Sequence, residues 1–173
     1  MRYIFVLITA SFLFGISGSL NAQINLNFNV DKQPIWGPTG YDYVQYYYLP
    51  DIETYYSVPQ HRYYYYNNGR WIYSSNLPSR YKNFDIYNSY KVVVNEPKPW
   101  QKHKDFKEKY FSFKGRHDQQ LIRDSRDAKY YIIKNHPEHK NWIKQQKHIT
   151  VKNKSGIQNN KSNNRDKNKN KKY

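Results

Sequence analysis

The stretch RYYYYNNGRWIYS, residues 62–74, decides the predicted fold. Two β-prone aromatic runs, Arg62–Tyr66 and Arg70–Ser74, flank an Asn-Gly pair. Asn-Gly is the preferred pair of a two-residue type I′ turn, because both central positions need a positive φ. The stretch therefore predicts a β-hairpin with Asn68 and Gly69 at its tip. The expected cross-strand pairs are Asn67 with Arg70, Tyr66 with Trp71, Tyr65 with Ile72, and Tyr64 with Tyr73.

This hairpin is aromatic on both faces. Half-buried hairpins normally alternate apolar with polar residues. Either a second layer covers the outer face, or that face is an aromatic platform that meets water. Monomers seldom expose large apolar patches without a use, so we expect helices from the following region to cover it. If the face is open, its side chains are the candidate binding residues: Tyr64, Tyr66, Trp71 and Tyr73.

Similar runs on either side of the hairpin predict a small antiparallel β-meander over residues 41–95. The further candidate strands are Tyr43–Leu49, Thr54–Val58 and Lys91–Val94. This block holds 15 of the 20 tyrosines in the chain. Tyrosine suits a core because its ring can be buried while its hydroxyl keeps a polar partner.

The segments around the meander differ from it in composition. Residues 23–40 are rich in Asn, Pro and Gly, which predicts an irregular lead-in. Residues 147–173 are mostly Lys, Asn and Gln, which predicts a disordered basic tail.

Between the meander and the tail, residues 96–146 carry apolar side chains at helical spacing, and we expect this segment to pack on the meander. Two or three helices are predicted there. The first carries Trp100, His103, Phe106 and Tyr110, the second spans Asp118–Asn135, and a third starts at Pro137 and ends after Ile143. The expected fold class is therefore α+β.

The first 22 residues have the three-part pattern of a secretory signal peptide. Met1 and Arg2 give a positive start, residues 3–16 form an apolar run, and residues 18–22 are small or polar apart from Leu20. The run is shorter than the roughly 20 apolar residues that span a membrane. We therefore expect cleavage before Gln23 and export to the periplasm or cell surface, with no transmembrane helix in the mature chain.

The 173-residue chain has a net charge of +16 and no cysteine. The lack of cysteine excludes a disulfide framework, a cysteine-ligated metal centre and a lipid-anchored lipoprotein. Between Lys134 and Tyr173, 12 Lys or Arg stand against two acidic residues, which places +10 of the charge there. Such a segment attracts polyanions. Because we expect export, the predicted partner is an anionic envelope polymer or glycan and not intracellular nucleic acid; a solubilising tail with no dedicated partner is the alternative.

Asp51 and Glu53 are a candidate pair for catalysis. Two residues that are two apart on a strand share one face, an arrangement that suits the paired carboxylates of a glycan hydrolase. Beside Pro50, a turn followed by a solvated strand start is the simpler interpretation. The sequence has no nucleophile elbow, no thiol nucleophile and no phosphate-binding glycine loop. We therefore expect no enzymatic activity, with a cell-wall glycan hydrolase as the alternative.

Six histidines raise a second alternative, a periplasmic metal-handling protein. His136 and His139 lie three residues apart, but neither spacing typical of zinc protease helices occurs. A structural zinc site needs two further ligands. The other histidines are scattered along the chain: His61, His103, His117 and His148. We expect neither a metal nor another cofactor.

Several short motifs together resemble a group of uncharacterised Tyr-rich secreted proteins of the Bacteroidota. They are YYYLPDI at 46–52, YY at 55–56, NGRW at 68–71, LPSRY at 77–81 and YKVVVN at 90–95. The resemblance covers roughly residues 36–142 as a pattern. It implies export to the envelope and carries no known activity, so no functional residue is transferred. The resulting hypothesis is a non-enzymatic exported protein that associates with anionic envelope polymers through its basic tail and an aromatic face.

Overall fold

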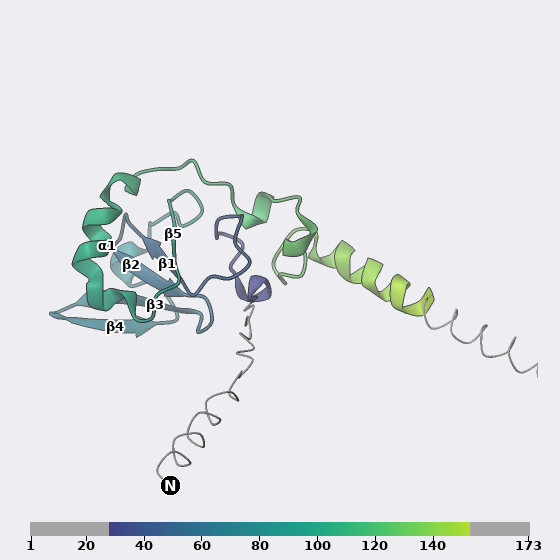
Figure 1. Ribbon diagram of the computed structural model, residues 1–173, viewed down its shortest axis with the longest axis horizontal. Coiled ribbons are helices and arrows are strands. Elements are labelled where there is room, and N and C mark those ends of the chain that lie inside the picture. The colour runs from purple at the N-terminus through teal and green to yellow at the C-terminus, as the bar shows by residue number, and fades with distance from the viewer. Residues whose placement is uncertain (1–27, 153–173) are drawn as a thin grey trace, which may run out of the picture.

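The computed structural model describes residues 28–152, and its centre is a five-stranded antiparallel sheet (Figure 1). The strand order is β4-β3-β2-β1-β5. The strands are β1 (Tyr46–Leu49), β2 (Thr54–Ser57), β3 (Arg62–Asn67), β4 (Arg70–Ser74) and β5 (Val92–Val94). Helical segments follow the sheet in the chain, so the predicted α+β fold class is confirmed.

The hairpin has the register that its sequence predicts. Tyr66 pairs with Trp71, and Asn67 pairs with Arg70 next to the turn. Asn68 and Gly69 have φ values of 46° and 82°, as a type I′ turn requires. The Asn-Gly pair therefore sets which side chains share each face of β3 and β4.

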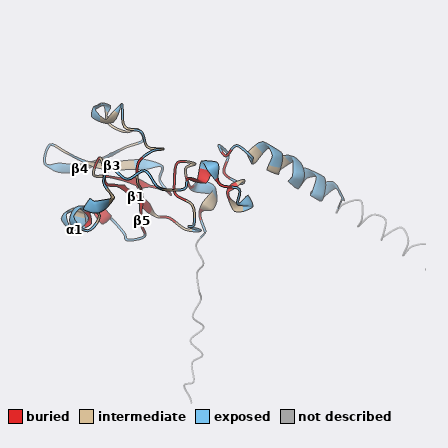
Figure 2. Ribbon diagram, turned by 90° about the horizontal axis from the view of Figure 1, so that it is seen from above, coloured by how far each residue is buried: buried red, intermediate tan, exposed pale blue. Residues whose placement is uncertain are grey.

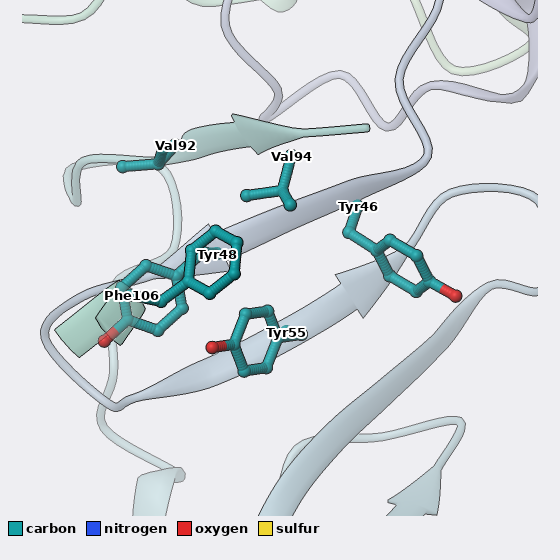
Figure 3. Packing of buried hydrophobic residues seen from close by; sticks show 6 residues of the cluster. All are labelled: Tyr46, Tyr48, Tyr55, Val92, Val94 and Phe106. Carbon is teal, nitrogen blue, oxygen red and sulfur yellow. The ribbon is translucent and has the colours of Figure 1, made fainter. Parts of the chain in front are cut away.

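One face of the sheet is covered by the chain that follows β5. The η3 turn (Pro99–Lys102), helix α1 (His103–Lys109) and the η4 turn (Phe111–Phe113) cross this face (Figure 1). Phe106 from α1 packs among residues of β1, β2 and β5, and Figure 3 shows this cluster: Tyr46, Tyr48, Tyr55, Val92, Val94 and Phe106. Trp100 stacks flat on Tyr64, with ring centroids 4.0 Å apart. The predicted first helix thus forms and packs as expected.

The opposite face is covered by the lead-in before the sheet, a segment whose composition predicts only irregular structure. Trp36 packs edge-on against Tyr47 and Tyr56, at centroid distances of 5.4 and 4.9 Å. Val44 and Val58 complete this second buried cluster. The described part of the lead-in, residues 28–40, holds a single turn of helix, η1 (Val30–Lys32), yet it supplies one of the two layers that bury the sheet.

The prediction of a second helix at Asp118–Asn135 is wrong. This segment contains only two short turns, η5 (Ile122–Asp124) and η6 (Ala128–Tyr130). Its main chain pairs instead with the lead-in: Ile122 N–H donates to the Gly37 carbonyl at 2.9 Å, and Arg123 N–H to that of Ile35 at 2.9 Å. Because these two N–H groups donate to the lead-in, they cannot form the hydrogen bonds of a helix. Of the apolar residues whose spacing suggested a helix, Leu121 and Ile122 are buried, but Ile132 is 43% exposed. The small core of this segment consists of Ile122, Tyr130 and Ile133, which pack against Val30 and Ile35.

The third predicted helix forms but is longer than expected. It covers residues 139–152, so it runs past Ile143 and six residues into the segment predicted as a disordered tail. Lys and Gln are good helix formers, and no Pro or Gly interrupts this stretch. The rest of the predicted tail and the predicted signal peptide lie outside the described residues. Within the described residues, none of the helices has the length and apolar character needed to span a bilayer.

The β5 edge of the sheet is closed by side chains. The Gln119 amide accepts from Lys91 N–H and donates to the Lys91 carbonyl, both at 2.7 Å, as a neighbouring strand would. The Lys91 ammonium is buried and donates to the carbonyls of Tyr87 and Ser89, at 3.2 and 2.7 Å. Burial lowers the pKa of Lys91 to about 8. The sheet therefore ends at β5, and β4 (Arg70–Ser74) is its other outer strand.

Replacing Gly37 with alanine tests how tightly the lead-in packs on the sheet. A Cβ there would lie 2.6 Å from the Tyr47 hydroxyl oxygen, well inside van der Waals contact. Because Tyr47 is fully buried, it cannot move aside, and we expect Gly37→Ala to lower the free energy of unfolding by about 1–3 kcal/mol. In a Tyr47→Phe background, where that oxygen is absent, the same change should cost less. Denaturant unfolding of all four proteins checks this, and additive losses would contradict the packing argument.

The tyrosine core predicts unfolding in alkaline solution. Burial raises the pKa values of Tyr47, Tyr48, Tyr55 and Tyr63 above that of a free tyrosine. The unfolded chain therefore releases protons near pH 10 that the folded chain keeps, so this stabilisation is complete below about pH 10 and is lost as the pH rises further. Lys91 acts in the opposite direction between about pH 8 and 10.4, since its lowered pKa makes folding easier as it loses its proton.

We therefore expect stability to fall above about pH 10, with the core tyrosines ionising only as the protein unfolds. Tyrosinate absorbance and circular dichroism, followed in one alkaline titration, measure both events. Ionisation of every tyrosine near pH 10 with an unchanged dichroism spectrum would contradict a buried tyrosine core.

Candidate binding cleft

A cleft of about 450 Å³ opens between the hairpin and helix α1. Three aromatic rings line it, together with three basic side chains, one carboxylate and one aliphatic residue. They are Tyr66, Trp71, Tyr81, His103, Lys104, Lys107, Glu53 and Ile52. A cleft with an aromatic wall and a few charged groups has the composition of a ligand-binding site.

The aromatic wall comes from the hairpin and from the η2 turn (Ser79–Tyr81). Tyr66 and Trp71 are cross-strand neighbours with ring centroids 5.6 Å apart. Arg80 fastens the turn to the hairpin, because its guanidinium donates to the Tyr66 carbonyl at 2.9 Å and to the Asn67 side chain at 3.0 Å. The same guanidinium lies over the Tyr81 ring, 4.8 Å from its centroid. The third ring is thus held in place by a residue next to it in the chain.

Helix α1 supplies the charged wall. Phe106 and Tyr110, four residues apart, face the sheet core. His103 and Lys107, also four residues apart, line the cleft together with Lys104. One short helix therefore both covers the sheet and brings basic groups opposite the aromatic rings.

Glu53 connects these groups in a chain of polar contacts. Its carboxylate lies 2.8 Å from the Lys107 ammonium and 3.6 Å from His103 Nε2. On the other side of the imidazole, the hydroxyl of the fully buried Tyr55 is 3.1 Å from Nδ1. Glu53 has a φ of 50°, in the left-handed region that non-glycine residues rarely occupy. Such backbone strain collects at functional sites.

The charges of this chain of contacts follow from its surroundings. Burial lowers the pKa of His103, although Glu53 and its hydrogen bond act in the opposite direction. His103 is therefore neutral near pH 7, with Tyr55 donating to Nδ1 and the Nε2–H directed towards Glu53. Burial alone would raise the pKa of Glu53, but the hydrogen bond and charge of Lys107, together with His103, lower it. Lys107 and Glu53 thus balance each other, and Lys104 gives the lining a net positive charge.

The structure brings two of the four predicted binding residues into the cleft, Tyr66 and Trp71. Tyr64 lies beneath Trp100, and Tyr73 lies outside the cleft with the Arg62 guanidinium 4.9 Å from its ring centroid. The expectation that helices cover the aromatic face is thus correct for Tyr64. Tyr66 and Tyr73 remain 54% and 59% exposed.

The structure separates the two carboxylates on which the glycan hydrolase alternative depends. Asp51 Oδ1 accepts from Gly115 N–H at 2.6 Å, and only Glu53 lines the cleft. Among the residues that the structure describes there, no second carboxylate faces Glu53 across the cleft. Asp51 and Glu53 both lie in the turn between β1 and β2, as the simpler interpretation predicts, and not on a strand.

The histidines that suggested a metal centre have other partners. His136 is buried; its Nδ1 accepts from Glu138 N–H and its Nε2 lies 3.1 Å from the Ile122 carbonyl. His139 Nδ1 lies 2.8 Å from the Tyr131 carbonyl. Across residues 28–152, no three His, Asp or Glu side chains come close enough to hold a metal ion.

Four of the eight residues that line the cleft are not among the candidates that the sequence suggests: Ile52, Tyr81, Lys104 and Lys107. The i, i+4 spacing of His103 and Lys107, next to the face that carries Phe106 and Tyr110, is a local signal for a second side of α1. Tyr81 has no such signal, because its position depends on the long-range bonds of Arg80 to the hairpin.

Compared with models of known protein families, with curated proteins and with solved structures, the chain matches none. Its resemblance to Tyr-rich secreted proteins of the Bacteroidota stays a prediction.

The effect of the neighbouring charges on the pKa of His103 can be tested by replacing Glu53 or Lys107. Because Glu53 favours the charged imidazolium, Glu53→Gln should lower the pKa of His103 further, while Lys107→Gln should raise it. An NMR titration of the imidazole protons measures both shifts. Asp118→Asn, on an exposed carboxylate paired with Arg116, is the matched control and should leave the titration of His103 unchanged. Equal behaviour of all three variants would show that Glu53 and Lys107 do not act on His103.

Proposed function

We propose that the protein binds an anionic glycan of the cell envelope in the cleft between the hairpin and α1, without catalysing a reaction. The observation that carries this proposal is the pairing of an aromatic wall, formed by Tyr66, Trp71 and Tyr81, with basic groups across the same cleft. These two walls match the two chemical features of an acidic sugar.

The aromatic wall suits a sugar ring. The C–H face of a pyranose is apolar and packs on an aromatic face, whereas its hydroxyls need polar partners at the ring edge. Tyr66 and Tyr81 offer both, since a tyrosine has an apolar body and a polar hydroxyl. The Arg80 contacts hold Tyr81 against the hairpin before any ligand arrives, which lowers the entropy lost on binding.

The basic wall suits a carboxylate or sulfate. Lys104 is the cation of the lining that has no counter-charge within it, because Lys107 pairs with Glu53. The chain as a whole carries +16, which attracts any polyanion over several ångströms. Binding should therefore weaken as salt shortens the Debye length from about 10 Å at 0.1 M to about 3 Å at 1 M.

The proposed location follows from the sequence. The signal-peptide pattern of residues 1–22 supports export, and an exported protein meets envelope glycans. The basic residues of 153–173 would add a second contact to a long polymer, and two linked contacts bind such a ligand more tightly than either one.

Tyrosines 66 and 73 give a matched test of the cleft. They lie on one face of the hairpin with similar exposure, but only Tyr66 lines the cleft. We expect Tyr66→Ala to weaken binding of polygalacturonate, an acidic polysaccharide, about tenfold, and Tyr73→Ala to leave it nearly unchanged. Lys104→Gln should weaken binding and flatten its salt dependence, with Lys114→Gln, an exposed lysine outside the cleft, as its control. Isothermal titration calorimetry, with dextran as the neutral polysaccharide, measures these affinities.

Three results would contradict the proposal. Equal losses in the two tyrosine variants would mean that the cleft is not the site. If binding is lost when the chain ends at Lys152 but is unchanged in Tyr66→Ala, the site lies in the basic tail. If the protein shortens the polysaccharide and Glu53→Gln abolishes this cleavage, the protein is a hydrolase and not a binding protein.

A further inference from the structure

The helix of residues 139–152 projects from the folded body, as the yellow-green ribbon of Figure 1 shows. Trp142 and Ile143, near its start, are half-buried, and every residue from 144 to 152 is exposed (Figure 2). The Trp142 N–H donates to the Glu138 carbonyl at 3.0 Å, which begins the helical hydrogen bonds. From residue 139 to 152 the helix contains no acidic residue.

The helix has an apolar stripe that the folded body covers only in part, near the start of the helix. Trp142 and Ile149, seven residues apart, lie on one side, and Ile143 and Thr150 lie beside them with the same spacing. Ile149 is 51% exposed. β-Branched residues in the last two turns disfavour a helix in water, and isolated helices shorter than about 12–15 residues are marginal. Such a helix is stabilised when its apolar stripe packs against an apolar surface.

The other side of the helix is basic. Lys140, Lys144 and Lys147 recur at intervals of four and three residues, so they lie together away from Trp142 and Ile149. Seven Lys or Arg and one Asp follow in residues 153–173. The partner therefore has to offer an apolar layer next to a dense negative charge.

We propose that the helix of residues 139–152 lies on an anionic phospholipid bilayer. Trp142, Ile143 and Ile149 enter the boundary between headgroups and acyl chains, while the three lysines contact the lipid phosphates. A bilayer supplies both required features at one surface, whereas a soluble polyanion supplies only the charge. The basic segment after the helix adds a second electrostatic attachment to the same surface. This proposal does not depend on the cleft.

Vesicle binding tests the proposal with charge and apolar contact varied separately. The protein is the chain from Gln23 onward, which contains every described residue and lacks the apolar run of residues 3–16, because that run would itself insert into lipid. We expect flotation with phosphatidylglycerol-containing vesicles and none with pure phosphatidylcholine vesicles. The triple variant Lys140→Gln, Lys144→Gln, Lys147→Gln should bind on the order of a hundredfold more weakly. The control replaces three exposed lysines of the body, Lys32, Lys82 and Lys114, with Gln and should bind nearly as well as the unaltered chain.

The apolar stripe is tested with Ile143→Ala and Ile149→Ala together, and with Ile149→Ala alone because that residue is exposed. Alanine favours a helix more than isoleucine does, so a loss of binding cannot be assigned to a weaker helix. We expect the double variant to bind vesicles at least about tenfold more weakly and to bind heparin, a soluble polyanion, as well as before.

Each other result overturns the proposal. If the isoleucine variants bind vesicles normally and the lysine variant binds neither vesicles nor heparin, the helix is a binding site for polyanions in general. If the body lysine control loses as much binding as the helix variant, only overall charge matters. Absence of flotation with anionic vesicles rejects a membrane role for the helix.

Discussion

A buried tyrosine hydroxyl needs a hydrogen-bond partner, and this requirement decides what covers the sheet. Two of the three inner strands, β1 and β2, carry tyrosines that are almost fully buried, including Tyr47, Tyr48 and Tyr55. Leaving such a hydroxyl without a partner costs about 1–3 kcal/mol. The layers over the sheet therefore have to bring polar groups as well as apolar surface. Within residues 28–152, no buried side-chain polar atom lacks a hydrogen bond.

Each covering layer brings one of these partners. The lead-in places Gln33 3.2 Å from the Tyr47 hydroxyl, and α1 places His103 3.1 Å from that of Tyr55. His103 is thus a core residue on one side and a cleft residue on the other. The hydroxyl of a core tyrosine fixes the imidazole that faces Glu53. Packing of the core and the electrostatics of the cleft are consequently not independent.

Local signals in the sequence predict the sheet and one of its two covers, the helix α1, but not the cover formed by the lead-in. Asn68 and Gly69 determine the hairpin register through backbone geometry alone, so the cross-strand pairs follow directly. The lead-in has no periodic pattern, and its role depends on Trp36 fitting between Tyr47 and Tyr56. Periodicity fails at Asp118–Asn135 because the apolar residues there serve a small core built on turns and on pairing with the lead-in. The same holds for the cleft: the hairpin register predicts that Tyr66 and Trp71 lie side by side, but no local signal predicts the position of Tyr81.

The cleft exists because β3 is longer than its neighbour β2. In their register Tyr55 pairs with Tyr64, so Tyr66 would face Glu53, but β2 begins only at Thr54. The left-handed backbone of Glu53 turns the chain away at this point. The Tyr66 carbonyl is then without a strand partner and is satisfied by Arg80, which also places Tyr81. A shortened strand therefore produces both the opening and the third ring of its aromatic wall, and α1 closes the other side with the basic groups that the proposed ligand requires.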